Sequence, residues 1–185
     1  MSLTDLSINK DWTLFLDRDG VINERLIDDY VKHLHELRIF DGVPEAIAFF
    51  NQLFKYVLVV TNQQGIGKGS MDESDLEIIH GYMNNVFENH GGKVDQFYFA
   101  PELAAEKNNN RKPGTGMGLA AQKDFPDIDF NKSIMIGDSE SDIEFGTKLG
   151  MKTILLTNGR NISTKADYIF NNLQSVVNEL KKIQH

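Results

Sequence analysis

Short apolar runs alternate with longer amphipathic stretches along the chain. Runs rich in apolar and β-prone residues predict strands at Thr13–Leu16, Tyr56–Val60, Gln96–Phe99, Ser133–Ile136 and Thr153–Leu156, with a weaker run at Tyr168–Phe170. Helical periodicity lies between these runs, at Val43–Phe54, Glu73–His90, Gly116–Lys123, Glu140–Leu149 and Leu173–Ile183. Buried strands that alternate with amphipathic helices are typical of a parallel sheet covered by helices on both faces. The pattern therefore predicts an α/β fold with a doubly wound parallel sheet.

Composition narrows the class of protein. The 185 residues fit a single domain, 1–185, because they can bury a core and show no internal repeat or interdomain linker. A formal net charge of −8 argues against nucleic acid or an anionic membrane as partner. The lack of cysteine excludes disulfides and thiolate metal sites. Because no signal peptide or membrane-spanning apolar run is recognisable, we expect a cytoplasmic protein, either a monomer or an oligomer of unknown size.

Polar residues with chemical potential follow four of the predicted strands. In doubly wound sheets, sites lie beyond the carboxyl ends of the strands, so these residues are expected to converge. They occur in Asp17-Arg18-Asp19-Gly20, Thr61-Asn62-Gln63-Gln64, Arg111-Lys112-Pro113-Gly114 and Gly137-Asp138-Ser139-Glu140-Ser141-Asp142. An acidic turn is an alternative interpretation of the first group, because Asp and Gly are common turn residues. Turn propensity does not explain why Thr, Arg and Lys follow the other strands.

Phosphoryl transfer needs these residue types. It requires a nucleophile, a proton donor for the leaving oxygen and positive charge around the transferring group. Asp17 is the candidate nucleophile, and Asp19 the candidate acid that protonates the leaving oxygen and later activates water. Thr61 and Lys112 are candidates for contacting the phosphoryl oxygens.

A hard cation also fits this set. Asp17, Asp138 and the backbone carbonyl of Asp19 offer oxygen ligands, which favour Mg²⁺. Asp142 follows Asp138 by four residues at a helix start, so it is expected to hold either a metal-bound water or Lys112.

The four groups together resemble the motifs of the haloacid dehalogenase (HAD) superfamily of phosphohydrolases. "DRDGV" is similar to its first motif, Thr61 to its second, Lys112 to its third and "GDSESD" to its fourth. The ordered set spans residues 13–156. The resemblance implies a Mg²⁺-dependent phosphomonoester hydrolase that acts through an aspartyl-phosphate.

A closer resemblance is carried by "FLDRDGVIN", "VVTNQQGIGKG", "RKPGTGM" and "GDSESDI". These segments are similar to those of the D-glycero-D-manno-heptose 1,7-bisphosphate phosphatases, with histidinol-phosphate phosphatases as relatives. The resemblance implies a small phosphorylated metabolite as substrate and no large cap domain. It also implies substrate-binding roles for these residues, in addition to Lys112: Tyr30, Asn62, Gln63, Gln64 and Arg111.

The chain departs from these relatives at one place. Many of them carry cysteines and a histidine that bind zinc just before Arg-Lys-Pro, whereas this chain reads "APELAAEKNNNRKP" there. This segment contains neither the cysteine nor the histidine ligands that a structural zinc ion needs, so we expect no zinc site there. The difference leaves the choice of sugar phosphate open, because the resemblance gives that loop a part in shaping the pocket.

Other functions fit the sequence less well. A receiver-type signalling domain is also doubly wound and phosphorylated on Asp, but it pairs adjacent acids after its first strand and places the phosphorylated Asp after its third. A DNA 3′-phosphatase conflicts with the acidic charge. "GIGKGS" lacks the Walker spacing, so it predicts a glycine-rich turn, with Asp72 as the N-cap of the next helix.

Overall fold

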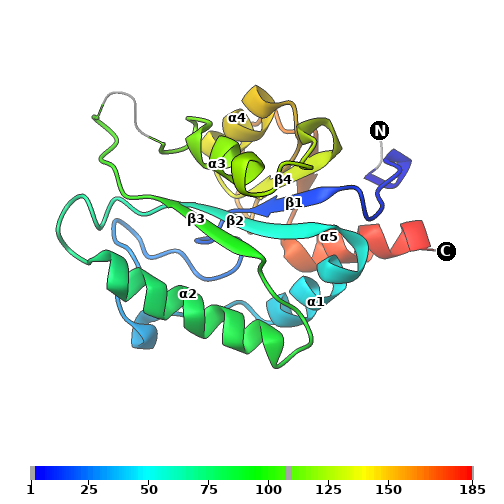
Figure 1. The fold of residues 1–185 in the computed structure, drawn as a ribbon. Coiled ribbons are helices and arrows are strands. Elements are labelled where there is room, and N and C mark those ends of the chain that lie inside the picture. The colour runs from blue at the N-terminus through cyan, green and yellow to red at the C-terminus, as the bar shows by residue number, and fades with distance from the viewer. Residues whose placement is uncertain (1–2, 107–109, 185) are drawn as a thin grey trace.

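The computed structural model describes residues 3–106 and 110–184, and these form an α/β fold around one six-stranded parallel sheet. The strand order is β3-β2-β1-β4-β5-β6, so the chain winds first to one side of β1 and then to the other (Figure 1). This order is that of a doubly wound sheet, whose switch point lies at β1 and β4. The predicted fold class is confirmed.

The strands match the apolar runs of the sequence to within two residues at their ends. They are β1 (Thr13–Leu16), β2 (Tyr56–Asn62), β3 (Gln96–Ala100), β4 (Ser133–Gly137), β5 (Lys152–Leu156) and β6 (Tyr168–Phe170). The helices are α1 (Val43–Leu53), α2 (Glu73–Glu88), α3 (Gly116–Asp124), α4 (Glu140–Leu149) and α5 (Leu173–Leu180). Short 3₁₀ turns lie at Leu3–Asp5, Leu34–Glu36, Phe130–Lys132 and Lys181–Gln184.

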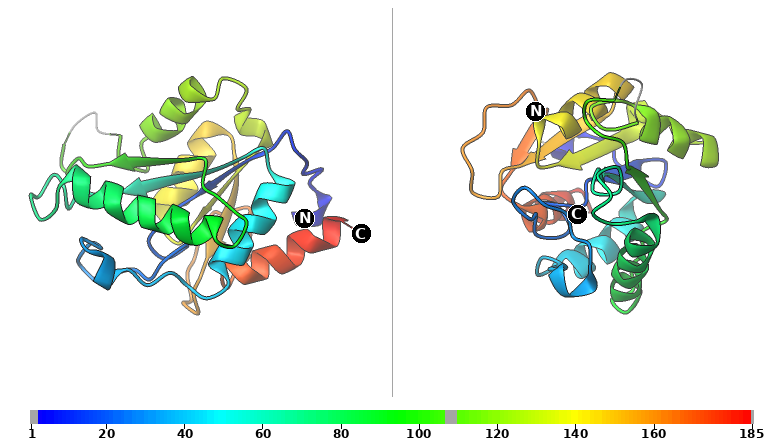
Figure 2. Two further views of the ribbon diagram at one scale, coloured as in Figure 1. Left: turned by 60° about the horizontal axis from the view of Figure 1, so that its bottom comes forward. Right: turned by 90° about the vertical axis from the view of Figure 1, so that its left-hand side faces the viewer.

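Two apolar layers sandwich the sheet. Alternate residues of a strand face opposite sides, so Leu14 and Leu16 pack in the core under α1, α2 and α5, whereas Phe15 packs under α3 and α4. Both helical layers are visible in Figure 1, with α3 and α4 on one face and α1, α2 and α5 on the other. The 3₁₀ turn Leu3–Asp5 lies beside α5 (Figure 2). Because both faces are buried, polar side chains can gather only at the strand ends.

The turns that lead out of the strands fit their sequences. Asp72 caps α2 by accepting a hydrogen bond of 3.0 Å from the backbone N–H of Asp75, as predicted. Ser139 caps α4 in a reciprocal arrangement with Asp142. Within the described residues, none of the helices is both long and apolar enough to cross a membrane.

Candidate active site

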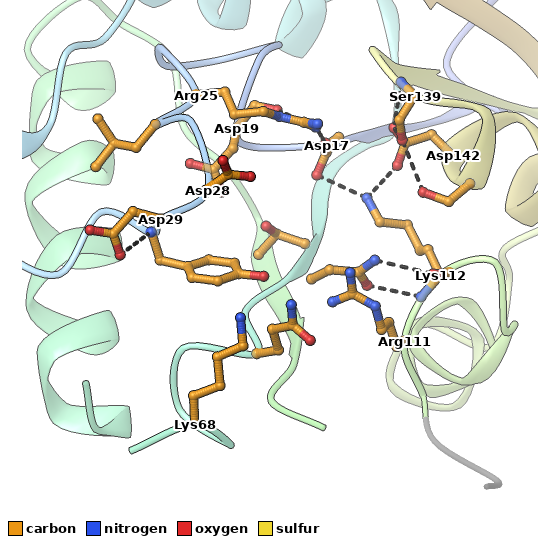
Figure 3. Close-up of a pocket in the computed structure, with 16 residues that line it drawn as sticks. Asp17, Asp19, Arg25, Asp28, Asp29, Lys68, Arg111, Lys112, Ser139 and Asp142 are labelled. Carbon is orange, nitrogen blue, oxygen red and sulfur yellow. Dashed lines mark hydrogen bonds and ion pairs between the residues drawn. The ribbon is translucent and has the colours of Figure 1, made fainter. Parts of the chain in front are cut away.

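The carboxyl ends of β1, β2 and β4 open into a cavity of about 410 Å³. Asp17 and Asp19 reach it from the end of β1, Thr61 from β2 and Asp142 from the first turn of α4 (Figure 3). Lys112 and Arg111 enter from the segment before α3. The structure therefore brings together residues from all four groups that the sequence singled out.

Lys112 joins two of these carboxylates. Its ammonium lies 2.8 Å from Asp17 Oδ1 and 2.6 Å from Asp142 Oδ1, and it also donates to the carbonyl of Val60 at 2.7 Å. Figure 3 shows the side chain extended from its loop to both acids. Ser139 donates through its hydroxyl to Asp142 at 2.6 Å, so Asp142 is fixed from both sides. Of the two roles expected for Asp142, the structure shows the contact with Lys112.

The electrostatics of this group follow from burial. Removal from water raises the pKa of Asp17 to about 7, with a further rise from the nearby Asp142 and an opposing effect of Lys112. Burial by itself would lower the pKa of Lys112, but Asp142 and Asp17 outweigh it and the net pKa is raised. Lys112 therefore stays charged, and the carboxylates carry more negative charge than one ammonium neutralises.

Asp138 forms the other side of the site and depends on a glycine. A Cβ on Gly20 would lie 2.3 Å from Asp138 Oδ2, and Gly20 has a φ of +91°, which favours glycine. The Asp138 carboxylate accepts hydrogen bonds from Arg25 Nη2 at 2.5 Å and from Arg160 Nη2 at 3.2 Å, and so forms ion pairs with both arginines. Even so, burial keeps the pKa of Asp138 raised.

Asp19 is held differently from the other acids. Arg18 donates to both of its carboxylate oxygens at 2.9 Å, and Asn23 and Gln63 donate at 2.9 and 2.8 Å. Burial would raise the pKa of Asp19, but these donors, Arg18 foremost, lower it. The carboxylate is therefore ionised, and Asp19 is among the residues that line the cavity.

The expected place of Gln63 is corrected by the structure. Its side chain is fully buried below the cavity, where it bridges Asp19 and the hydroxyl of Thr61, and it does not line the pocket. Thr61, Asn62 and Gln64 line the cavity, whereas the side chain of Gln63 is engaged by its contacts with Asp19 and Thr61.

The outer wall holds the other candidates for substrate contact. Tyr30, Gln64 and Arg111 line the cavity, and the Lys68 ammonium lies 5.9 Å from the centre of the Tyr30 ring. Asn62 also fixes the loop of Lys112, because its side-chain oxygen accepts from the Lys112 N–H at 2.8 Å and its amide donates to the Lys112 carbonyl at 3.1 Å. Residues 107–109 of the cysteine-free loop lie outside the described part of the chain.

Sequence reasoning missed three arginines of the site. Arg160 follows the fifth strand, so the same strand-end rule could have found it. Arg25 lies in a segment without periodicity and gave no signal. Arg18 stands between the two acids, is completely buried and contacts His80 at 3.4 Å. Its cationic side chain supplies the partner that a buried carboxylate such as Asp19 needs.

The carboxylates have the chemistry and spacing of a cation site. Asp17, Asp138 and Asp142 each offer one oxygen, and these oxygens all lie within 4.8 Å of one another. They are the one such group of metal-ligating side chains found in the described ranges. The buried, mutually repelling acids and the all-oxygen donor set fit Mg²⁺.

Comparison with known proteins assigns the class. A HAD-hydrolase-like family model matches residues 109–183. The D,D-heptose 1,7-bisphosphate phosphatase of B. bronchiseptica, solved with magnesium and phosphate, superposes with a TM-score of 0.83 at 27% identity and covers 92% of this chain and 98% of its own. The chain thus has the fold of the HAD-type phosphatases and belongs to this class of enzyme.

Curated relatives refine this class. The D-glycero-α-D-manno-heptose-1,7-bisphosphate 7-phosphatase of Burkholderia mallei is 38% identical over 91% of this chain and 93% of its own length. The enzyme of the same name from Campylobacter jejuni is 36% identical over 91% and 95%. The β-anomer enzyme of Vibrio cholerae is 34% identical over 83% and 86%. The chain belongs to the family of heptose 1,7-bisphosphate 7-phosphatases.

Proposed function

We propose that this phosphatase removes the 7-phosphate of D-glycero-D-manno-heptose 1,7-bisphosphate with the help of Mg²⁺ and an aspartyl-phosphate on Asp17. The observation that carries the proposal is the placement of Asp17 at the end of β1, in contact with Lys112 and grouped with Asp138 and Asp142. A magnesium ion held by Asp17, Asp138 and the carbonyl of Asp19, with Asp142 beside it, would draw in the substrate phosphate and neutralise its charge.

In the first step, a carboxylate oxygen of Asp17 forms a bond to phosphorus while the bond from phosphorus to the sugar oxygen breaks. Asp19 gives its proton to the leaving oxygen. The donors around Asp19 favour its ionised form, so the proton must be taken up when the substrate is present. The anionic phosphate of a bound substrate raises the pKa of the nearby Asp19 carboxyl group, so that Asp19 can take up this proton.

In the second step, Asp19 acts as the base. Its carboxylate takes a proton from water, the water oxygen bonds to phosphorus and the acyl phosphate bond to Asp17 breaks. Arg18, Asn23 and Gln63 hold the carboxylate in its ionised form, which suits this step directly. Lys112 and the Thr61 hydroxyl stabilise the transferring group in both steps.

The substrate assignment rests on the relatives and on the cavity wall. The names of the relatives divide between α and β anomers of the same bisphosphate. Arg111, Lys68 and Tyr30 offer positive charge and an aromatic ring at a distance from Asp17, which suits a sugar with a second phosphate.

The test is a comparison of kcat/KM for both heptose 1,7-bisphosphate anomers, histidinol phosphate and common hexose phosphates. We expect one heptose bisphosphate anomer to exceed the monophosphates by about tenfold or more, since one lost charged contact is worth that much. Preference for histidinol phosphate would support the alternative substrate. Failure to hydrolyse any of them would contradict the phosphatase assignment for this chain.

Asp19→Ala should slow hydrolysis of alkyl phosphates by about 10²–10⁴-fold, the range for loss of a general acid–base group. The loss should be much smaller for p-nitrophenyl phosphate, whose leaving group needs little protonation. Asp28→Asn, which removes a negative charge from the same cavity, serves as control and should show the leaving-group dependence of the wild type. Equal slowing of alkyl and aryl substrates by Asp19→Ala would contradict the role of Asp19.

Arg111→Ala and Lys112→Ala should affect different kinetic constants. Lys112 touches Asp17, so its loss should mainly lower kcat, whereas Arg111 lies further out and its loss should mainly raise KM for the bisphosphate. Steady-state kinetics with the bisphosphate and with p-nitrophenyl phosphate separates the two. An equal effect of Arg111→Ala on both substrates would refute its part in substrate recognition.

A further inference from the structure

Arg25 places one guanidinium nitrogen among three oxygens from three different groups. Its Nη2 lies 2.5 Å from Asp138 Oδ1, 3.2 Å from the backbone carbonyl oxygen of Asp19 and 3.7 Å from Asp17 Oδ2. Figure 3 shows the side chain directed across Asp19 toward Asp17. Asp138 and Asp17 both contribute to raising the pKa of Arg25, against the effect of its burial.

The same three groups are the ligands proposed for Mg²⁺. Magnesium binds oxygen at about 2.0–2.1 Å in a tight octahedron, which leaves no room for a guanidinium nitrogen between the same oxygens. Contact of Arg25 with all three groups and direct coordination of the cation by them therefore exclude each other.

We propose that Arg25 is a built-in competitor of the metal: its guanidinium takes the cation's place between Asp17, Asp19 and Asp138 and must leave when the cation binds. This inference rests on the metal site of the proposed function. Until the cation binds, Arg25 neutralises the buried carboxylates and reduces the repulsion between them. Because the contacts of Arg25 with these groups must be broken before the cation can bind, Arg25 lowers the apparent affinity of the site for the metal.

The surroundings of Arg25 allow it to leave. Its side chain is 46% exposed, unlike the acids it contacts, which are 3% and 7% exposed. It lines the main cavity and also a second cavity on the far side of Asp138, beside Glu24 and Arg160. The guanidinium can thus move into either space without disturbing the core.

Arg160 provides a matched control. It also contacts Asp138: its Nη2 lies 3.2 Å from Asp138 Oδ2 and 2.9 Å from the backbone carbonyl oxygen of Asp138. Its side chain is 47% exposed. No contact of Arg160 with Asp17 or Asp19 is found among the described residues. A change of Arg160 to Gln removes the same charge from the same carboxylate without vacating the metal position.

The test measures Mg²⁺ affinity by isothermal titration calorimetry in the wild type, Arg25→Gln and Arg160→Gln, and the melting temperature of each in EDTA and in saturating Mg²⁺. Arg25→Gln should bind Mg²⁺ at least about fivefold more tightly than the wild type, the lower end of typical coupling between two ligands, and clearly more tightly than Arg160→Gln. In EDTA it should melt at a lower temperature than the wild type, and Mg²⁺ should remove that difference.

The outcomes separate the inference from the function it rests on. Equal or weaker Mg²⁺ binding by Arg25→Gln, or the same gain in Arg160→Gln, would overturn the competition while leaving the metal site intact. Failure of all three proteins to bind Mg²⁺ would overturn the metal site and the competition with it. For Arg25→Ala, added guanidinium ion should weaken Mg²⁺ binding, whereas the wild type should show no such change; equal responses would also count against direct competition.

Discussion

Asp17→Asn should abolish turnover, with a loss of about 10⁵-fold or more, comparable with the removal of a nucleophile in other covalent enzymes. The amide has nearly the shape of the carboxylate but cannot attack phosphorus. Its oxygen can still accept from Lys112, which keeps its ion pair with Asp142. Turnover of p-nitrophenyl phosphate and of the bisphosphate measures the effect.

The Asp17→Asn variant should lose turnover but should not lose thermal stability. Because burial raises the pKa of Asp17 to about 7, its charged form is less favourable in the folded protein than in the unfolded chain. A raised carboxyl pKa means that stability is lost as pH rises from the unfolded pKa toward about 7, so a neutral Asn should match or exceed the wild-type melting temperature at pH 8 in EDTA.

Asp127→Asn is the matched control for this substitution. Asp127 pairs with Lys55 and Tyr56 at the start of β2, the opposite end of the strand from the site, so its loss should leave turnover unchanged. More than a few per cent of wild-type activity in Asp17→Asn would remove Asp17 as the nucleophile. Unfolding of Asp17→Asn would contradict the explanation of its pKa.

Removal of the metal should have the second largest effect. Activity should vanish in EDTA and return with Mg²⁺, because the cation held by the buried carboxylates would draw in the substrate phosphate and neutralise the charge of the transferring group. The fold should survive chelation, since the two apolar layers hold the sheet and Arg25, Arg160 and Lys112 still neutralise the acids.

Zinc should have no part in this behaviour. The chain has no cysteine to form a nitrogen–sulfur cage before Arg111. Metal analysis of protein purified without a metal-affinity tag, combined with circular dichroism in EDTA, tests this expectation. Stoichiometric zinc, or unfolding on chelation, would contradict it.

The fold could be predicted because its four central strands, β2, β1, β4 and β5, are buried on both faces. Runs such as Tyr56–Val60 are continuously apolar, which identifies them as buried strands, and the strand-end rule then selects Asp17, Thr61 and Asp138. The helix start after Asp138 was predictable from Ser139 and Asp142, which form the cap.

The parts that sequence did not predict depend on tertiary contacts. Gln63 could not be told from Gln64, because only the direction of the extended chain decides which of them lines the cavity. Arg25 reaches Asp138 across a sequence separation of 113 residues from a segment without regular structure. Charge pairing of this kind leaves no periodic trace in the sequence.

The most direct measurement is the stereochemical course at phosphorus when a phosphorothioate monoester, made chiral with ¹⁶O and ¹⁸O, is hydrolysed in ¹⁷O-labelled water. Attack by Asp17 followed by attack of water on the aspartyl-thiophosphate inverts phosphorus twice, so the released thiophosphate should show overall retention. Inversion would mean that water attacks the substrate directly and would contradict the covalent role of Asp17.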